Sequence, residues 1–356
     1  MTEGVGSGEL DLNDARRQYH YAMAPEDYGR LPFYSALLGE MENDHLALEL
    51  LASVRASQRN PMLVLAALQL AALRGHVVLA PIYDDARRGE LRRPKSAAHR
   101  VIATLHDEPH LVRSELWRST QTNEPGRSAI LQAVVVDLVH GGETVNVLEI
   151  GASAGINLRF DQFPVRSFDD ANPLTLVCED RTEIDRTRKL PRVKKRVGID
   201  LNPLSLTKEE DRLWLKACLW AEERRRHERF DAIVAAHEHW PRATILKGSV
   251  RDRLDDAFNR CATGNTTIIV NTWTAAYFRQ EEREWYFEEV SRRSARDNVA
   301  WISIESPMVA WPGVDVIKDD PHRAASQIVV SHFGASPVRW GWCHAHGRWL
   351  ERTTGA

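Results

Sequence analysis

The sequence predicts an α/β protein in which an all-helical module precedes a mostly parallel sheet covered by helices on both faces. Two observations predict this class. Up to Gly142, apolar residues recur at helical spacing with almost no strand signal. After Gly142, short apolar runs alternate with helical stretches, as in successive strand-helix-strand units. The 356 residues suffice for both parts.

Composition excludes several classes of protein. The net charge of −3, from 47 basic and 50 acidic side chains, provides no overall field that would attract nucleic acid or an anionic membrane. The four cysteines have no metal-like spacing, and the N-terminus has no apolar signal core. The most apolar run, residues 61–73, is too short to span a bilayer. We expect a cytoplasmic protein with reduced thiols and no membrane partner.

The helical module is expected over residues 9–142, after a polar, Gly-rich segment at 1–8 that we expect to be disordered. Pro61 begins one of its helices, and Gly141 and Gly142 end the last one. Helical patterns cover 33–52, 61–73, 96–117 and 130–140.

The second part is expected over residues 143–356 and carries the sheet. A long connection at 164–196 indicates an insertion, with a hairpin around 174–178. Strands are expected at 145–150, 197–201, 243–246, 267–270, 300–304 and 327–332. Helices are expected at 154–163, 208–240 with a break near Arg229, 251–261 and 280–296.

A glycine-rich turn directly follows the first strand. Gly151, Ser153 and Gly155 stand where the first turn of a doubly wound sheet lets the backbone approach a ligand. A dinucleotide fingerprint fits poorly, because Ser153 and Ile156 replace its second and third glycines. The spacing also matches a hydrolase nucleophile elbow with Ser153 as nucleophile. Its place after a helical module, without an oxyanion segment, argues against that alternative.

The same turn resembles the acidic-turn-glycine pattern of S-adenosylmethionine-dependent methyltransferases, which have a Rossmann-like fold. The resemblance implies that an acid ending the next strand binds the ribose hydroxyls. Asp200 is the first choice and Glu179 the fallback. The cofactor-binding residues that this resemblance implies are Glu149, Gly151, Ala152, Ser153, Gly155, Asn157, Asp200, Leu201, Ser249 and Val250.

A wider resemblance covers nearly the whole chain. The segment QTNEPGRS at 121–128, the GASAGIN turn, GIDLNP and the terminal HGRWL together resemble the bacterial domain-of-unknown-function 2332 family. This resemblance implies a helical part before a methyltransferase-like domain, and it brings no substrate or catalytic residue.

The end of the fourth expected strand supplies candidate catalytic residues. Asn271 can orient an amine or hydroxyl, and Trp273 can stack on a planar group or face a sulfonium. A carboxylate base is missing here, so we expect catalysis by proximity, or a base such as Tyr277 or Glu305. The alternative is a merely structural strand end with a buried tryptophan.

The polar bend before the last helix of the module supplies candidate substrate-binding residues. Gln121, Asn123 and Arg127 either cap a turn or face a substrate, with Arg127 as the anion-binding group. In the second case we expect the helical module to be a cap over the acceptor pocket.

Other charged clusters have ordinary explanations. The basic runs 186–196 and 224–226 lack interleaved aromatic residues, which argues against nucleic-acid binding. The paired histidines 237/239 and 344/346 match no metal motif, so we expect no metal site. The sequence therefore predicts a methyltransferase that uses S-adenosylmethionine on a small-molecule acceptor. Two alternatives remain: a serine hydrolase, or a non-catalytic module that binds a nucleotide or a partner protein.

Overall fold

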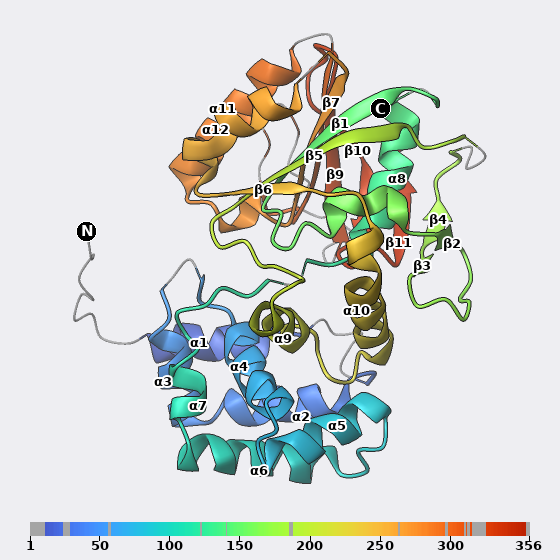
Figure 1. Cartoon of the computed structure of the whole chain (residues 1–356). Helices are drawn as coiled ribbons and strands as arrows, with labels where there is room; N and C mark the ends of the chain where they lie inside the picture. Colours follow the sequence, from blue (N-terminus) through green and yellow to red (C-terminus); the bar gives the residue numbers. More distant parts are fainter. Residues whose placement is uncertain are drawn as a thin grey trace. The chain divides into compact units, whose positions relative to one another are not determined.

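The computed structural model forms two compact units, which Figure 1 shows and which we describe separately. The first unit comprises Met1–Thr122 with Thr207–Phe230, and the second comprises Asn123–Leu206 with Asp231–Ala356. The expected disorder at 1–8 lies outside the described residues. The structure describes residues 11–23, 29–55, 58–121, 123–139, 141–184, 188–262, 264–295, 298–309, 311, 314 and 325–353.

The first unit confirms the helical N-terminal region. Polar side chains cap the starts of two of its helices: Asp44 accepts the Ala47 N–H at 2.9 Å, and Asn60 accepts the Met62 N–H at 2.9 Å. Its helices are α1 (Leu12–His20), α2 (Pro32–Met41), α3 (His45–Ala52), α4 (Pro61–Leu73), α5 (Leu79–Arg88), α6 (Pro94–Asp107), α7 (His110–Arg113) and α9 (Glu209–Ala217). Helix α10 (Arg224–Ala236) crosses the boundary between the units.

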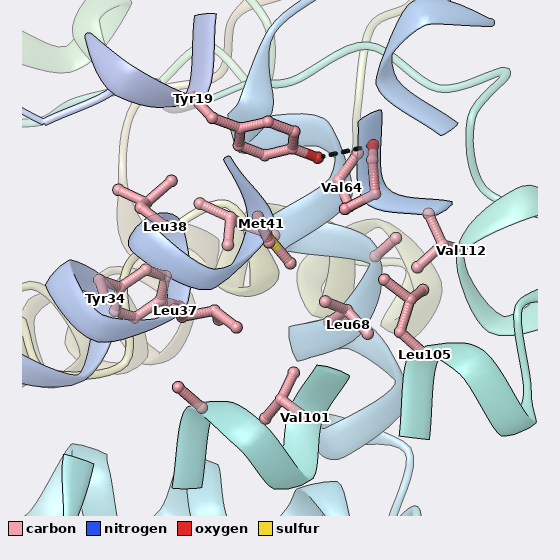
Figure 2. Packing of buried hydrophobic residues seen from close by; sticks show 14 of the residues in the cluster. Tyr19, Tyr34, Leu37, Leu38, Met41, Val64, Leu68, Val101, Leu105 and Val112 are labelled. Atoms are coloured by element: carbon pink, nitrogen blue, oxygen red, sulfur yellow. Dashed lines mark hydrogen bonds between the residues drawn. The ribbon is translucent and has the colours of Figure 1, made fainter. Parts of the chain in front are cut away.

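Apolar side chains from most of these helices form one core. Figure 2 shows Tyr19, Leu37 and Leu68 within it, with the Tyr19 hydroxyl donating to the Ala47 carbonyl at 3.2 Å. Residues 207–230 join this unit partly through Glu222, whose carboxylate accepts the first backbone N–H groups of α2. A remote carboxylate thus replaces the local cap that α2 lacks.

The second unit is built on a nine-stranded sheet with the order β4-β11-β10-β9-β8-β7-β1-β5-β6. Its strands are β1 (Thr144–Ile150), β4 (Glu179–Arg181), β5 (Arg192–Asp200), β6 (Thr244–Lys247), β7 (Thr266–Thr272), β8 (Val299–Glu305), β9 (Ala325–His332), β10 (Val338–His344) and β11 (Trp349–Arg352). The five strands from β6 to β8 are mutually parallel. From β1 the chain first adds β5 and β6 on one side, and then β7 and β8 on the other side. The position between β1 and β7 is therefore a topological switch point.

Antiparallel strands complete the sheet. Strand β9 runs antiparallel to both β8 and β10, and β10 also runs antiparallel to β11. The sequence predicts β9 but misses β10 and β11. Gly341 interrupts the apolar pattern of β10, and β11 is only 4 residues long, so neither has a clear strand signal.

Helices cover both faces of the sheet, as expected. Helices α11 (Val250–Cys261) and α12 (Gln280–Ser294) lie on one face, and α8 (Arg127–Leu138) lies on the other (Figure 1). Helix α8 belongs to the second unit, although its sequence reads as the last helix of the first part. In the connection from α10 to β6 lies the short 3-10 helix η4 (His237–His239).

Three local predictions are wrong. After β1 the chain forms a short 3-10 helix, η3 (Asn157–Gln162), kinked at Arg159, in place of a full helix over 154–163. The expected hairpin near 174–178 is a parallel pair of β2 (Val165–Arg166) with β3 (Leu176–Val177). The long helical stretch 208–240 breaks between α9 and α10, where Leu219 and Ala221 are buried, and not near Arg229.

No helix within the described residues has the length and apolar character needed to cross a membrane.

Candidate functional site

The glycine-rich turn lies at the carboxyl edge of the sheet, next to the switch point. Gly151, Ser153 and Gly155 have φ angles of 76°, 51° and 72°, all in the left-handed region. The turn rests on the end of β5, because the Gly151 and Ala152 N–H groups both donate to the Ile199 carbonyl. The expected strand and turn are present, while the helix that should follow is reduced to η3.

Gly151 lies close to the segment that follows β7. A Cβ added there would lie 2.2 Å from Thr274 Oγ1, so only glycine fits. Thr274 Oγ1 also donates to the Ile150 carbonyl at 3.0 Å. The turn after β1 and the segment after β7 therefore form one surface.

Asp200 joins this turn to the end of β5. Its Oδ2 accepts the Ser153 N–H at 2.8 Å, and its Oδ1 accepts the Asn202 N–H at 2.8 Å. Burial raises the pKa of Asp200, and the two backbone N–H groups act in the opposite direction. A carboxylate has about four acceptor positions, so capacity remains for a ligand. The fallback acid, Glu179, lies on β4 at the opposite end of the sheet and pairs with Arg181.

Glu149 is a buried carboxyl beside the turn. Only 1% of the residue is exposed, and neither carboxyl oxygen has a hydrogen-bond partner among the described residues. The Leu158 N–H lies nearby without hydrogen-bond geometry. Burial raises the Glu149 pKa to about 8, and the charge of Arg127 opposes this shift. Among the described residues, neither Glu149 oxygen therefore has a hydrogen-bond donor or a cation bound to it.

Arg127 is a buried cation at the same edge. Its Nη1 donates to the Thr272 carbonyl and its Nε to the Ala345 carbonyl, both at 3.1 Å. Burial lowers the Arg127 pKa, while Glu124 and Glu305 oppose that shift. No described carboxylate forms an ion pair with this guanidinium.

The other two candidate residues of the polar bend, Asn123 and Gln121, belong to different units of the structure. Asn123 belongs to the sheet unit, where its Nδ2 donates to the Ala152 carbonyl at 3.4 Å and its Oδ1 accepts the Ile156 N–H at 3.2 Å. It therefore fastens both ends of the turn. Gln121 belongs to the helical unit, where its backbone hydrogen-bonds with Cys218.

The candidate catalytic Asn271 is engaged inside the protein. Its Nδ2 donates to Ser303 Oγ and Glu305 Oε1, while its Oδ1 accepts from the Tyr286 hydroxyl and Trp301 Nε1. All four of its amide hydrogen-bonding positions are therefore used.

The carboxylate of Glu305 orders the segment after β7. It accepts the Thr274 and Ala275 N–H groups at 2.8 and 2.9 Å, and burial raises its pKa. This segment then enters the short η5 (Ala275–Tyr277).

Trp273 and Tyr277 differ in exposure and constraint. Trp273 has a φ of 54° and its indole N–H donates to Ser326 Oγ at 2.8 Å, whereas Tyr277 is 45% exposed. Asn123, Ser153 and Trp273 are three of the four non-glycine residues with positive φ in the described chain. Such strained residues concentrate at functional sites, and these three lie at one sheet edge.

The other cofactor-binding residues that the methyltransferase resemblance implies differ in their contacts and in their exposure. Ala152 packs over Gly198, Asn157 accepts from Ser128, and Leu201 is 61% exposed directly after Asp200. Ser249 caps α11 and Val250 is buried in the core below. The sequence does not single out Arg159, whose charge acts on Glu149 from the kinked η3, because the kink has no sequence signal.

Metal-binding groups do not gather in the described part of the chain, where no cluster of three or more His, Cys, Asp or Glu residues could hold an ion. His344 and His346 are ring neighbours at the end of β10. Part of the basic insertion, residues 185–187, lies outside the described residues.

These features define a mixed α/β protein with a helical N-terminal region, a large mostly parallel sheet and a polar turn at its switch point. The chain belongs to the family described as "Uncharacterized protein conserved in bacteria (DUF2332)", whose model matches residues 17–352. The predicted family is thereby confirmed. No curated protein matches the sequence significantly.

Proposed function

We propose that this protein binds S-adenosylmethionine at the turn 151–155 and transfers its methyl group to a small-molecule acceptor. The observation that carries the proposal is the position of Asp200. Its carboxylate adjoins a left-handed glycine turn at the carboxyl edge of a doubly wound sheet, where such sheets bind nucleotides. The strand order β6-β5-β1-β7-β8 also agrees with the Rossmann-like fold of the methyltransferases that the sequence resembles.

The charges around the turn favour a cationic ligand. Three carboxylates, Glu124, Asp200 and Glu305, stand against the guanidinium groups of Arg127 and Arg159, while Glu149 is protonated near neutral pH. A sulfonium with its ammonium group would offset this excess of acid, whereas the pyrophosphate of NAD would add to it. Glu149 supports the same choice, because its oxygens lack the donor that a ligand ammonium would supply.

In this proposal the residues of the chain bind the cofactor and orient the acceptor. Asp200 accepts the ribose hydroxyls, the turn backbone lies along the cofactor, and exposed Leu201 covers the adenine. Bound S-adenosylmethionine supplies an activated methyl group, so alignment of the acceptor accounts for much of the catalysis. The acceptor side is formed by the segment after β7, with Trp273 against the methyl group and Tyr277 as the candidate base in its phenolate form. Asn271 holds that segment from within.

One geometric feature favours the hydrolase alternative. Ser153 has a φ of 51°, and a nucleophilic serine also sits on a strained turn. However, the neighbouring acid Asp200 accepts the backbone N–H of Ser153, whereas a triad acid holds a histidine. The reduced helix η3 and the engaged Asn271 are compatible with the second alternative, a non-catalytic binding module.

Calorimetry on the full chain distinguishes these functions. The proposal predicts saturable binding of S-adenosylmethionine and S-adenosylhomocysteine, with NAD binding much more weakly. Binding of NAD alone, or of none of the three by folded protein, would overturn it.

A further inference from the structure

We infer that Arg127 receives a carboxylate group of the methyl acceptor, so that the acceptor is a small carboxylic acid; this inference rests on the proposed function.

The guanidinium has unused donors. It carries five N–H donors, and two of them are engaged, by the Thr272 and Ala345 carbonyls. Three donors therefore remain, including both on Nη2, which forms no hydrogen bond with a described residue. They are enough for a two-point contact with a planar carboxylate.

The guanidinium is also buried without an anion. Only 8% of Arg127 is exposed, and no described carboxylate lies within ion-pair distance. Other buried arginines of the same unit are paired: Arg196 contacts Asp161 at 2.7 Å, and Arg293 contacts Glu289 at 3.2 Å. Buried cations normally require such a partner, so Arg127 is the exception among these three.

The carboxylates that influence Arg127 are already committed. Glu305 accepts backbone N–H groups of the segment after β7, and Glu124 accepts the Gly126 N–H at 2.9 Å. Burial keeps Glu149 protonated near neutral pH. The charges of Glu124 and Glu305 therefore stabilise the buried guanidinium without occupying its remaining donors.

Position links this cation to the acceptor. Arg127 holds the Thr272 carbonyl, one residue before Trp273, and Tyr277 is close enough to act on its charge. Asp200 lies across the turn at the end of β5. A cationic cofactor on the Asp200 side and an anionic acceptor on the Arg127 side would have complementary charges where they meet.

The test compares acids with their amides. Calorimetry would measure binding of acetate, succinate and benzoate against acetamide, succinamide and benzamide, with full-length protein saturated with S-adenosylhomocysteine. We expect at least one acid to bind at least tenfold more tightly than its amide, and Arg127→Lys to remove most of this preference. Arg293→Lys, which changes a buried arginine that already has a partner, should keep it.

The outcomes separate the two proposals. If no acid exceeds its amide with wild-type protein, the Arg127 inference is overturned, whether or not the variants fold. The same holds if Arg127→Lys folds and keeps the preference. If S-adenosylhomocysteine fails to bind while the preference depends on Arg127, the carboxylate site stands and the methyltransferase proposal falls.

Discussion

The carboxylate of Asp200 accepts the backbone N–H of Ser153 at 2.8 Å, across 47 residues of sequence. This contact ties the turn after β1 to the end of β5. It positions an acid beside a glycine turn whose backbone can closely approach a ligand. Nucleotide-binding sheets use this arrangement to bind a ribose.

Asp200→Asn should weaken the binding of S-adenosylhomocysteine. Loss of one charged acceptor costs about 1.5–3 kcal/mol, which corresponds to about tenfold or more in Kd. Calorimetry checks this result, with Asp256→Asn on α11 as the control, since that half-buried acid forms an ion pair with Arg260. Equal affinities for Asp200→Asn and wild type would remove Asp200 from the site.

Glu149→Gln should change how stability depends on pH. The Glu149 pKa is about 8 in the folded protein and near 4.5 when unfolded, so folding takes up a proton between these values. Stability should therefore fall with rising pH across this window, by up to about 1.4 kcal/mol per pH unit. Glutamine cannot ionise, so the variant should lose this slope and gain stability above pH 7.

Urea unfolding of both proteins at several pH values from 5 to 9 measures this slope. Glu238→Gln is a suitable control, because Glu238 lies in the short 3-10 helix η4 of the same unit and none of that helix is buried. Parallel stability profiles for wild type and Glu149→Gln would contradict the raised pKa.

Much of the sheet and its turn could be predicted from sequence, because buried parallel strands are short apolar runs and the turn has glycines at fixed spacing. Strands β1, β5, β6, β7 and β8 all overlap predicted runs, although β5 begins at Arg192, within the segment expected to be an insertion. The place of Asp200 at the end of a strand next to β1 could likewise be predicted, whereas its role as a cofactor ligand stays a prediction.

The features that could not be predicted from the sequence depend on contacts between residues far apart in the chain. The amide of Asn271 is fully engaged only through four residues that come later in the chain: Tyr286, Trp301, Ser303 and Glu305. Membership of 207–230 in the helical unit similarly depends on Glu222 reaching α2. No local sequence pattern indicates these hydrogen bonds. From the sequence alone, Asn271 is therefore interpreted as a group that is free to bind a ligand.

Gly151→Ala should destabilise the protein more than Gly264→Ala. Both glycines have nearly equal φ angles, 76° and 78°, so both alanines bear the same left-handed penalty of about 1–2 kcal/mol. A Cβ at Gly264 meets open space, whereas one at Gly151 would collide with Thr274. The collision should cost a further 1–3 kcal/mol or so. Thermal or urea unfolding measures the difference, and equal losses would show that the turn can move away from Thr274.

Ser153 should behave as a turn residue and not as a nucleophile. A fluorophosphonate probe should leave it unlabelled, with mass spectrometry of the peptide around the turn giving the same signal as in Ser153→Gly. That variant should fold with a stability within about 1 kcal/mol of wild type, because glycine relieves the strain at a φ of 51° but adds flexibility to the unfolded chain. It should also keep its affinity for S-adenosylhomocysteine, since the N–H at 153 that reaches Asp200 is retained. Stoichiometric labelling of Ser153 that disappears in Ser153→Gly would instead establish the hydrolase alternative.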